Sequence, residues 1–419
     1  MTEPTKRGHQ VTRSFESELE AIERWNPLVE AFVDWCPATA ARRAAAAISG
    51  PLSGWSVVVK DIIDLAAEPT RCNADFIPAQ PAPKHAAIVD CLVRLGAFIL
   101  AKSVTTTFAY LDPGPTRNPW NLEHTPGGSS SGSAAAVACG LARLALGSQT
   151  VGSVNRPASY CGVVGFKPTY GRIPTEGVFP FSPSVDTMGF FTRHVGDMQA
   201  VFEAVVQESA VRNPSVPLKV AVVTNLGCEA ADPEMIDAVQ AVAGKLRHAG
   251  HRVCSLELPA FVKKAYELHF LLIRSEVADV HREYFRQYGS GYRPRLREAI
   301  ERGQQVTSQQ LQGIQKHRKK TITAFDQLLD DNDIWLLPSA AGIAPRGLDS
   351  TGDPRMNLLA TYTGVPALTL PVALGEHGLP LGVQVIGRRM NDRALLAAGA
   401  VIEQLIGFEH QPRLPGASG

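Results

Sequence analysis

The sequence lacks the features that define several large classes of protein. Its seven cysteines are an odd number and form no CxxC pair, which argues against a disulfide framework and against a zinc site. No run of about 18 apolar residues occurs, so no transmembrane helix is expected. The opening residues, MTEPTKRGHQ, contain no apolar stretch of a signal peptide. These absences predict a cytoplasmic protein in a reducing compartment.

Charge and histidine spacing argue against further classes. The chain has 41 Lys and Arg against 40 Asp and Glu, a formal net charge of +1. Such a balance gives no reason to expect nucleic acid or an anionic membrane as a partner. The 11 histidines show no paired spacing such as HExxH, so no metal site is predicted.

The chain does contain enough apolar sequence for a large core: 45% of its 419 residues are hydrophobic. Strand-like runs at 55–60 and 97–101 flank a helical segment at 86–95, which predicts a parallel βαβ unit and an α/β fold. Further strands are predicted at 219–223, 253–256, 334–337, 367–372 and 383–386. Further helices are predicted at 14–33, 133–145, 233–249, 267–288, 308–330 and 392–405.

A lysine at the end of an apolar run is the first candidate for chemistry. Lys60 follows three valines, and a strand of this kind carries its side chain toward the core. Burial penalises the ammonium and lowers a lysine pKa by up to ~3–5 units in extreme cases. A neutral amine is a competent general base near pH 7. The alternative is a lysine at a strand end whose ammonium stays in water.

Two serines in Gly-rich turns could work with such a base. Ser129 lies in GGSSSG, a composition that also fits a flexible linker or, without its GK[ST] ending, a weak phosphate loop. Ser153 ends the turn GSQTVGS, which could aim several backbone amides at the oxygen of an attacked carbonyl. Ser153 would be the nucleophile, activated by Lys60 through Ser129. The alternative for Ser153 is a turn serine that bonds its own backbone.

The motifs around these residues resemble the amidase signature family. They are VVVKDIID, GGSSSGSAAAV, RPASYCGVVGFKPTYGRIP, GVPALTLPV and GLPLGVQVIG, in the order of the family and across nearly the whole chain. The resemblance implies a single domain over residues 1–419, with a central mixed β-sheet covered by helices on both faces. It leaves room for a helical, variable subdomain near the substrate pocket at about 225–330.

The resemblance also implies a Ser–cis-Ser–Lys triad. Ser153 is then the nucleophile, Ser129 the bridging serine beside a cis peptide bond, and Lys60 the base. The backbone amides of Thr150, Val151, Gly152 and Ser153 would form the oxyanion hole. No metal and no organic cofactor is implied.

The sequence departs from the usual family pattern near Ser153. Gln149 stands where Asp is usual, Val151 where Gly is usual, and Asn155 where Arg is usual. These departures and the run SVNRPA are similar to the malonamidase-like branch, in which the arginine matching Arg156 grips a substrate carboxylate. A structural pair is the alternative role for Arg156. The predicted substrate-binding residues are Arg156, Ser130 and Gln149.

The function implied is hydrolysis of a C–N acyl bond in a small molecule through a covalent acyl-enzyme. Three alternatives stay open: a hydrolase of aryl amides, esters or carbamates, the amidase component of a tRNA-dependent amidotransferase, and a catalytically silent binding protein. The expected partner is a small-molecule amide, ester or carbamate, and a homodimer is left open.

Overall fold

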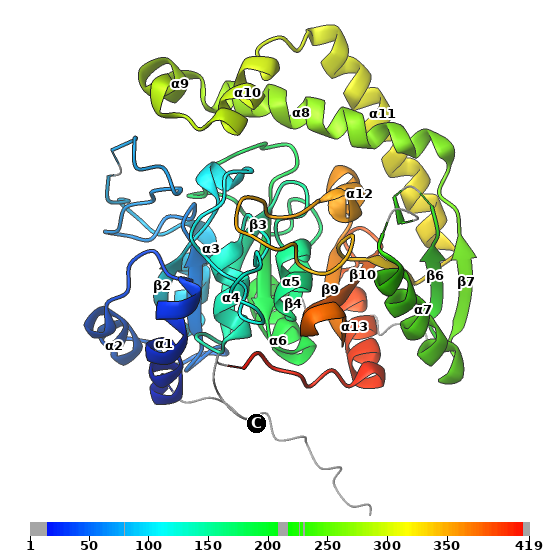
Figure 1. Ribbon diagram of the computed structural model, residues 1–419, viewed down its shortest axis with the longest axis horizontal. Helices are drawn as coiled ribbons and strands as arrows, with labels where there is room; N and C mark the ends of the chain where they lie inside the picture. Colours follow the sequence, from blue (N-terminus) through cyan, green and yellow to red (C-terminus); the bar gives the residue numbers. More distant parts are fainter. Residues whose placement is uncertain (1–14, 79, 208–216, 226, 229–230, 414–419) are drawn as a thin grey trace, which may run out of the picture.

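The apolar runs form the strands of one mixed sheet in the computed structural model, which describes residues 15–78, 80–207, 217–225, 227–228 and 231–413 (Figure 1). The strands are β1 Ser56–Lys60, β2 Phe98–Ser103, β3 Leu144–Gln149, β4 Val164–Lys167, β5 Thr187–Thr192, β6 Lys219–Val223, β7 Arg252–Leu256, β8 Ile334–Pro338, β9 Ala367–Leu374 and β10 Pro380–Gly387. Their order is β2-β1-β3-β5-β4-β9-β10-β8-β6-β7. The outer strands pair in parallel and the inner ones antiparallel, so the predicted mixed sheet is confirmed.

Helices cover both faces of this sheet. In β1, Val57 and Val59 pack in the largest core with α3, α6, α7 and α13, while Val58 packs on the opposite face with α1, α4 and α5. The helices are α1 Phe15–Val29, α2 Pro37–Ala45, α3 Ala87–Arg94, α4 Ser131–Ala138, α5 Asn155–Cys161, α6 Val195–Val206, α7 Pro233–His248, α8 Ala265–Val280, α9 Arg282–Tyr288, α10 Pro294–Gly303, α11 Ser308–Asp330, α12 Arg355–Thr363 and α13 Asp392–Ile406. The small side chains of α4 allow it to lie close to the strands that carry the candidate site.

Two predicted helices differ from those observed. The helix predicted at 133–145 ends at Ala138, and its last residues instead begin β3. Gly140 breaks the helix with a left-handed φ of 69°, which glycine adopts without steric cost. The helix predicted at 267–288 is two helices, α8 and α9, which meet at His281.

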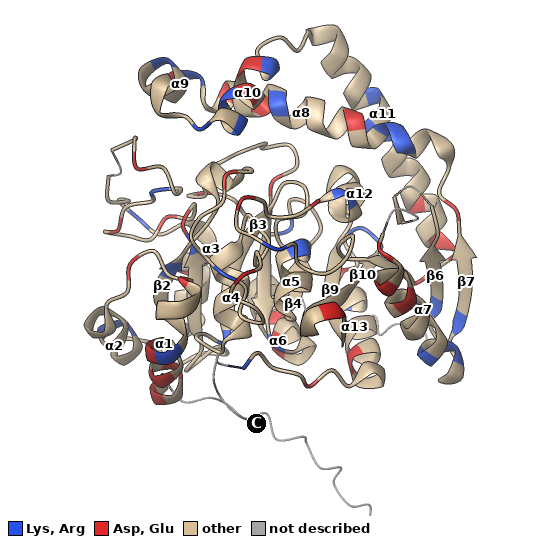
Figure 2. Ribbon diagram, viewed as in Figure 1, with Lys and Arg blue, Asp and Glu red and all other residues tan. Residues whose placement is uncertain are grey.

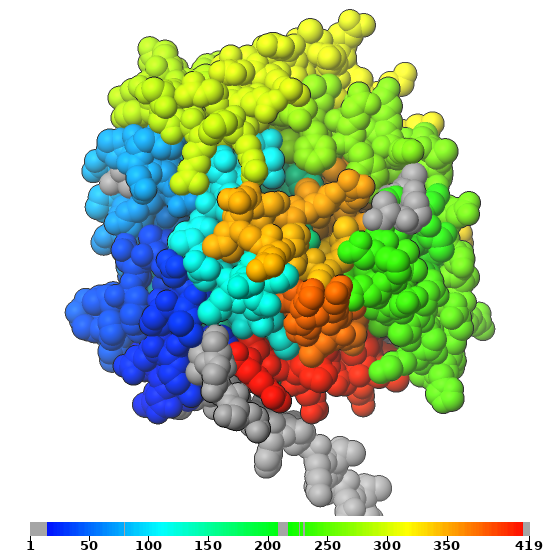
Figure 3. Space-filling model, viewed as in Figure 1, coloured from blue at the N-terminus to red at the C-terminus, as the bar shows by residue number. Residues whose placement is uncertain are grey.

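Within the region at about 225–330 for which a helical subdomain is predicted, β7 belongs to the sheet and α7 packs in its covering layer. We call residues 265–330, which comprise α8 to α11, the helical lobe. Figure 3 shows the lobe lying against segments from the first third and the last quarter of the chain. Arg295 joins all three, donating to the Leu111 carbonyl at 3.1 Å and to the Asp349 carbonyl at 3.0 Å. In Figure 2 the lobe carries Lys and Arg interspersed with Asp and Glu.

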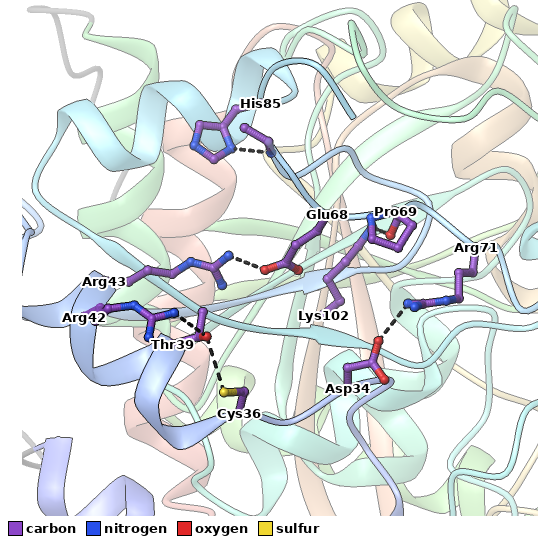
Figure 4. Close-up of polar contacts among 11 residues, drawn as sticks. Asp34, Cys36, Thr39, Arg42, Arg43, Glu68, Pro69, Arg71, His85 and Lys102 are labelled. Carbon is purple, nitrogen blue, oxygen red and sulfur yellow. Dashed lines mark hydrogen bonds and ion pairs between the residues drawn. The ribbon is translucent and has the colours of Figure 1, made fainter. Parts of the chain in front are cut away.

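Ion pairs hold the segment that follows Lys60. Asp61 pairs with Lys102 at 2.8 Å, and both side chains are almost fully buried. Lys102 also donates to the Pro69 carbonyl at 3.1 Å, and Arg71 and Glu68 pair with residues of the N-terminal segment (Figure 4). Removing one partner of such a buried pair strongly destabilises the folded protein, because the other charge is left buried without compensation. These contacts fix the chain on leaving β1 and so help to hold the end of that strand.

Candidate active site

Lys60 occupies the last position of β1, which pairs with β2 on one side and β3 on the other. The strand is buried along its length, and Lys60 is 0% exposed. Its Nζ donates to the Ser129 Oγ at 2.7 Å and to the Ser148 Oγ at 2.9 Å. Burial lowers the pKa of Lys60 to about 7, although the nearby Asp186 carboxylate acts to raise it. The amine is therefore close to half neutral at pH 7, which suits a general base.

Ser129 lies in the turn before α4, and the peptide bond between Gly128 and Ser129 is cis. The Ser129 carbonyl accepts a hydrogen bond from the Thr106 amide at 3.3 Å. A Cβ at Gly128 would lie 2.8 Å from the Thr351 Cγ2, so the close packing of this turn favours glycine. Ser129 itself is 2% exposed. The Gly/Ser composition that would suit a linker thus forms a packed turn.

Ser153 stands on the adjoining loop, just before α5, with a partly exposed side chain. The Ser130 amide donates to the Ser153 carbonyl at 3.4 Å and so links this loop to the turn that carries Ser129. Within the described residues, the Ser153 hydroxyl has no hydrogen-bond partner. The structure therefore brings Lys60 and Ser129 into contact and places Ser153 on the next loop, without a direct bond between the two serine hydroxyls.

The loop of residues 150–153, which we call the oxyanion loop, is anchored through its carbonyl groups. All four carbonyls accept a hydrogen bond from the surrounding protein. The donors, in chain order, are the His269 ring at 2.8 Å, the Thr361 hydroxyl at 2.8 Å, the Arg156 amide at 3.0 Å and the Ser130 amide at 3.4 Å. By contrast, the amides of Val151, Gly152 and Ser153 donate no hydrogen bond within the part of the chain that the structure describes. Val151 lies outside the left-handed region, so its side chain imposes no backbone strain there.

Arg156 extends from the first turn of α5 and is 3% exposed. Its Nη2 donates to the Gly128 carbonyl at 2.6 Å and to the Thr351 Oγ1 at 3.0 Å. Its Nε and Nη1 are buried and have no hydrogen-bond partner among the described residues. Burial lowers the pKa of Arg156, while the Asp353 carboxylate, which acts to raise it, pairs with Arg355. One side of the guanidinium therefore supports the turn before Ser129, and the other retains unpaired donors.

Gln149 and Ser130 are fully buried and bond to the protein itself. The Gln149 Oε1 accepts from the amides of Val154 at 2.9 Å and Asn155 at 3.0 Å, at the start of α5. Its Nε2 donates to the Thr361 Oγ1 at 3.1 Å. The Ser130 hydroxyl donates to a β3 carbonyl at 3.3 Å. These contacts hold the loops in place, and substrate binding by either side chain stays a prediction.

Sequence reasoning missed several residues at this site. Ser148 accepts the second hydrogen bond from the lysine, although GSQTVGS contains it. Asp186 anchors a turn by accepting from the Phe181 amide at 2.8 Å, and it also accepts from the Thr150 Oγ1 at 2.6 Å. His269, from α8, has no sequence signal at all, because only the fold brings it against the oxyanion loop.

A cavity of about 220 Å³ adjoins the oxyanion loop. Its polar lining residues are Ser148, Thr150, Thr175, Asp186 and Thr187. The rest of the lining is mostly apolar and includes Ile62, Ala109, Val178, Phe179, Phe181 and Met188. Among the described residues, no cluster of His, Cys, Asp and Glu is arranged to hold a metal ion, and no helix is long and apolar enough to cross a membrane.

Comparison with known proteins identifies the class to which this fold and site belong. The Amidase family profile matches residues 11–396, so the chain belongs to the Amidase family. It is accordingly a hydrolase that acts on carbon–nitrogen bonds.

Individual relatives cover nearly the whole chain. The 2-amino-5-chloromuconic acid deaminase of Comamonas testosteroni is 33% identical, over 92% of this chain and 91% of the relative. A component of the glutamyl-tRNA(Gln) amidotransferase of Moorella thermoacetica is 31% identical, over 87% of this chain and 85% of the relative. A crystal structure of an amidase superposes with a TM-score of 0.87 at 30% identity, over 94% of this chain and 95% of that one.

Proposed function

We propose that the protein hydrolyses the C–N acyl bond of a small-molecule amide through Lys60, Ser129 and Ser153. The neutral Lys60 amine takes a proton from Ser129 as Ser129 takes one from Ser153. The Ser153 Oγ bonds to the carbonyl carbon. The negative charge that develops on the carbonyl oxygen is stabilised by hydrogen bonds from the free amides of the oxyanion loop. The buried Lys60–Ser129 contact of 2.7 Å is the observation that carries this proposal.

The second half of the reaction uses the same relay in reverse. The Lys60 ammonium returns its proton through Ser129 to the leaving nitrogen, and the C–N bond breaks to leave an ester on Ser153. Water then attacks this acyl-enzyme, with Lys60 again accepting the proton. The acid is released and Ser153 regains its hydroxyl.

A fluorophosphonate should label the protein once, on Ser153. The partly exposed hydroxyl beside free backbone amides is arranged to attack phosphorus as it would a carbonyl carbon. Mass spectrometry of the digested protein would locate the adduct, with heat-denatured protein as the control. Labelling elsewhere, or none while amide hydrolysis continues, would rule out Ser153 as the nucleophile.

Arg156 is the residue that we propose binds a substrate carboxylate. Its buried Nε and Nη1 have no partner in the part of the chain that the structure describes, and a carboxylate can accept from two such donors at once. Arg156→Ala should lower kcat/KM for malonamate by about 10–100-fold, the worth of a charge-assisted hydrogen bond. A neutral anilide supplies the control, since loss of the contact to Gly128 affects both substrates. An unchanged ratio of the two kcat/KM values would contradict carboxylate binding.

The apolar cavity favours a second candidate, hydrolysis of neutral aryl amides, esters or carbamates. Its volume of about 220 Å³ and mostly apolar lining suit an uncharged ring better than a small diacid derivative. The same acyl-enzyme chemistry serves these substrates. Comparing kcat/KM for malonamate, an anilide, an aryl ester and an aryl carbamate separates the candidates. Only malonamate carries a carboxylate, and only the other three carry an aromatic ring.

A third candidate is the amidase component of a tRNA-dependent amidotransferase. The similarity to components of glutamyl-tRNA(Gln) amidotransferases favours it. The Asp–Arg pair usual in the family is replaced here by Gln149 and Asn155, whose side chains bond separately to other parts of the protein. Glutaminase activity and co-purification with partner proteins would support this candidate, whereas efficient turnover of amides by the isolated chain would support the first.

A further inference from the structure

The anchoring of the oxyanion loop determines where its amides point. In a planar trans peptide unit, the carbonyl of one residue and the amide of the next point in opposite directions. A donor that holds the Thr150 carbonyl therefore sets the direction of the Val151 amide. In the same way, a donor to the Val151 carbonyl sets the direction of the Gly152 amide. The groups that hold these two carbonyls are side chains, from His269 and Thr361.

The surroundings of His269 hold its ring in one orientation as a hydrogen-bond donor. It lies on α8, is 0% exposed, and its Nε2 is 2.8 Å from the Thr150 carbonyl oxygen. Because a carbonyl oxygen can only accept, Nε2 carries the proton. Burial lowers the pKa of His269 to about 4, so the ring is neutral at pH 7 and Nδ1 carries none. The ring packs edge-on to Tyr362 and Phe270, which limits its rotation.

Thr361 holds the next peptide unit from α12. Its hydroxyl donates to the Val151 carbonyl at 2.8 Å and accepts from the Gln149 Nε2 at 3.1 Å. The oxyanion loop also lies close to this helix, because a Cβ on Gly152 would come within 2.5 Å of the Asn357 Oδ1. The Thr361 hydroxyl has one proton to donate, and the Val151 carbonyl at 2.8 Å is a closer acceptor for it than the Asn357 carbonyl at 3.5 Å.

We propose that His269 and Thr361 are positioning residues that aim the Val151 and Gly152 amides at the developing oxyanion. Neither side chain touches a reacting atom, and the inference rests on the proposed function of Ser153. It has a structural consequence. Since His269 belongs to the helical lobe, one donor of the oxyanion hole is set by a segment outside the central sheet. Displacing α8 from the sheet would release the Thr150 carbonyl and misdirect the Val151 amide.

His269→Phe and Thr361→Val test this inference, since each removes a donor and keeps much of the side-chain shape. Each should lower kcat for the best amide substrate by about 10–100-fold, below the loss for deleting an oxyanion donor outright. KM should change less than about threefold, because the contact matters only as charge develops. Affinity for a trifluoromethyl ketone, whose serine adduct carries the negative oxygen, should fall by the same factor as kcat.

Conservative variants and a matched control sharpen the result. Thr361→Ser keeps the donor and should retain most of kcat, and His269→Gln should recover part of it through the side-chain amide. His281 is a second buried histidine at the end of the same helix, but its Nδ1 contacts the Tyr292 hydroxyl at 2.8 Å. His281→Phe should leave kcat and ketone affinity within about threefold of wild type, since no oxyanion donor depends on it.

The outcomes separate this inference from the proposed function. Unchanged kcat in His269→Phe and Thr361→Val, a rise in KM alone, or a lower kcat with unchanged ketone affinity would each overturn the positioning role. If His269→Phe does not fold, Thr361→Val decides. Activity that survives in Ser153→Ala would defeat the proposed function itself, whereas an inactive Ser153→Ala beside fully active His269 and Thr361 variants would defeat only this inference.

Discussion

Ser153→Ala is expected to lower kcat for amide hydrolysis by about 10⁴–10⁶-fold, the range seen when the nucleophile of an acyl-transfer enzyme is removed. The physical reason is that the Lys60–Ser129 relay then has no hydroxyl to deprotonate at the carbonyl carbon. Substrate can still bind, and the free amides of the oxyanion loop can still polarise its carbonyl. KM should therefore change far less than kcat.

Steady-state kinetics and the thermal unfolding midpoint together check this result. Ser159→Ala is the matched control, because Ser159 lies on α5 near the same loop and its buried hydroxyl bonds to no other described residue. It should retain wild-type kcat. Since Ser153 is partly exposed, its replacement should leave the unfolding midpoint nearly unchanged. A kcat within tenfold of wild type would show that another group attacks the carbonyl.

Long apolar runs made much of the sheet predictable. The runs at β1, β2, β6 and β8 are short, strongly apolar and bounded by turns, and these features identify them as buried strands. The strand β3 was not predicted, because the helix predicted at 133–145 included its first two residues and the turn GSQTVGS included its last three. Its strand conformation depends on pairing with β1 on one side and β5 on the other, which is tertiary information. The strands β4 and β5 went unassigned for the same reason.

The site was predictable only where its parts lie in recognisable motifs. Lys60, Ser129 and Ser153 each follow an apolar run or a Gly-rich turn, and both are visible in the sequence. The groups that hold them are not. His269 and Thr361 come from helices more than 100 residues further along the chain, as their contacts with Thr150 and Val151 show. These anchoring side chains have no local sequence pattern, because their contacts with the oxyanion loop arise only when the helical lobe and α12 pack against the sheet.

Gln149 occupies a motif position whose contacts in the fold the sequence does not reveal, and substrate binding by its side chain stays a prediction. Its place beside the oxyanion loop favoured a role in substrate binding. In the fold, its amide oxygen accepts two backbone amides at the start of α5, and its nitrogen bonds to Thr361. An acceptor there satisfies helix-terminal amides that would otherwise be unpaired. Sequence position alone cannot distinguish a side chain that faces the pocket from one that caps the neighbouring helix.

Lys60→Met is the second replacement with a large expected effect, a fall in kcat of about 10⁴-fold, comparable to loss of one member of a catalytic triad. Methionine fills a similar volume but cannot accept a proton from Ser129. Lys60→Arg should be as inactive, because a guanidinium stays protonated throughout the working pH range. Activity retained in either variant would mean that the base lies elsewhere.

The pH profile of the wild-type enzyme tests the same assignment independently. Burial lowers the pKa of Lys60 to about 7, so the competent neutral amine disappears as pH falls through that value. We expect kcat/KM to be level above about pH 8 and to fall about tenfold per pH unit below about pH 6, as for a single essential base. A profile that is flat from pH 6 to pH 8, or that persists unchanged in the residual activity of Lys60→Met, would contradict this role.

Lys167 provides a control that separates burial from catalysis. It is also fully buried, and burial lowers its pKa to about 7 as well. Its Nζ donates to the carbonyls of Pro168 at 3.0 Å and Val365 at 2.7 Å. Lys167→Met leaves two buried acceptors unpaired and should lower the unfolding midpoint, while the pH profile of kcat/KM keeps its wild-type inflection. Two lysines with equal burial and similar pKa values then differ only in what they touch, and only the one bonded to Ser129 should control the rate.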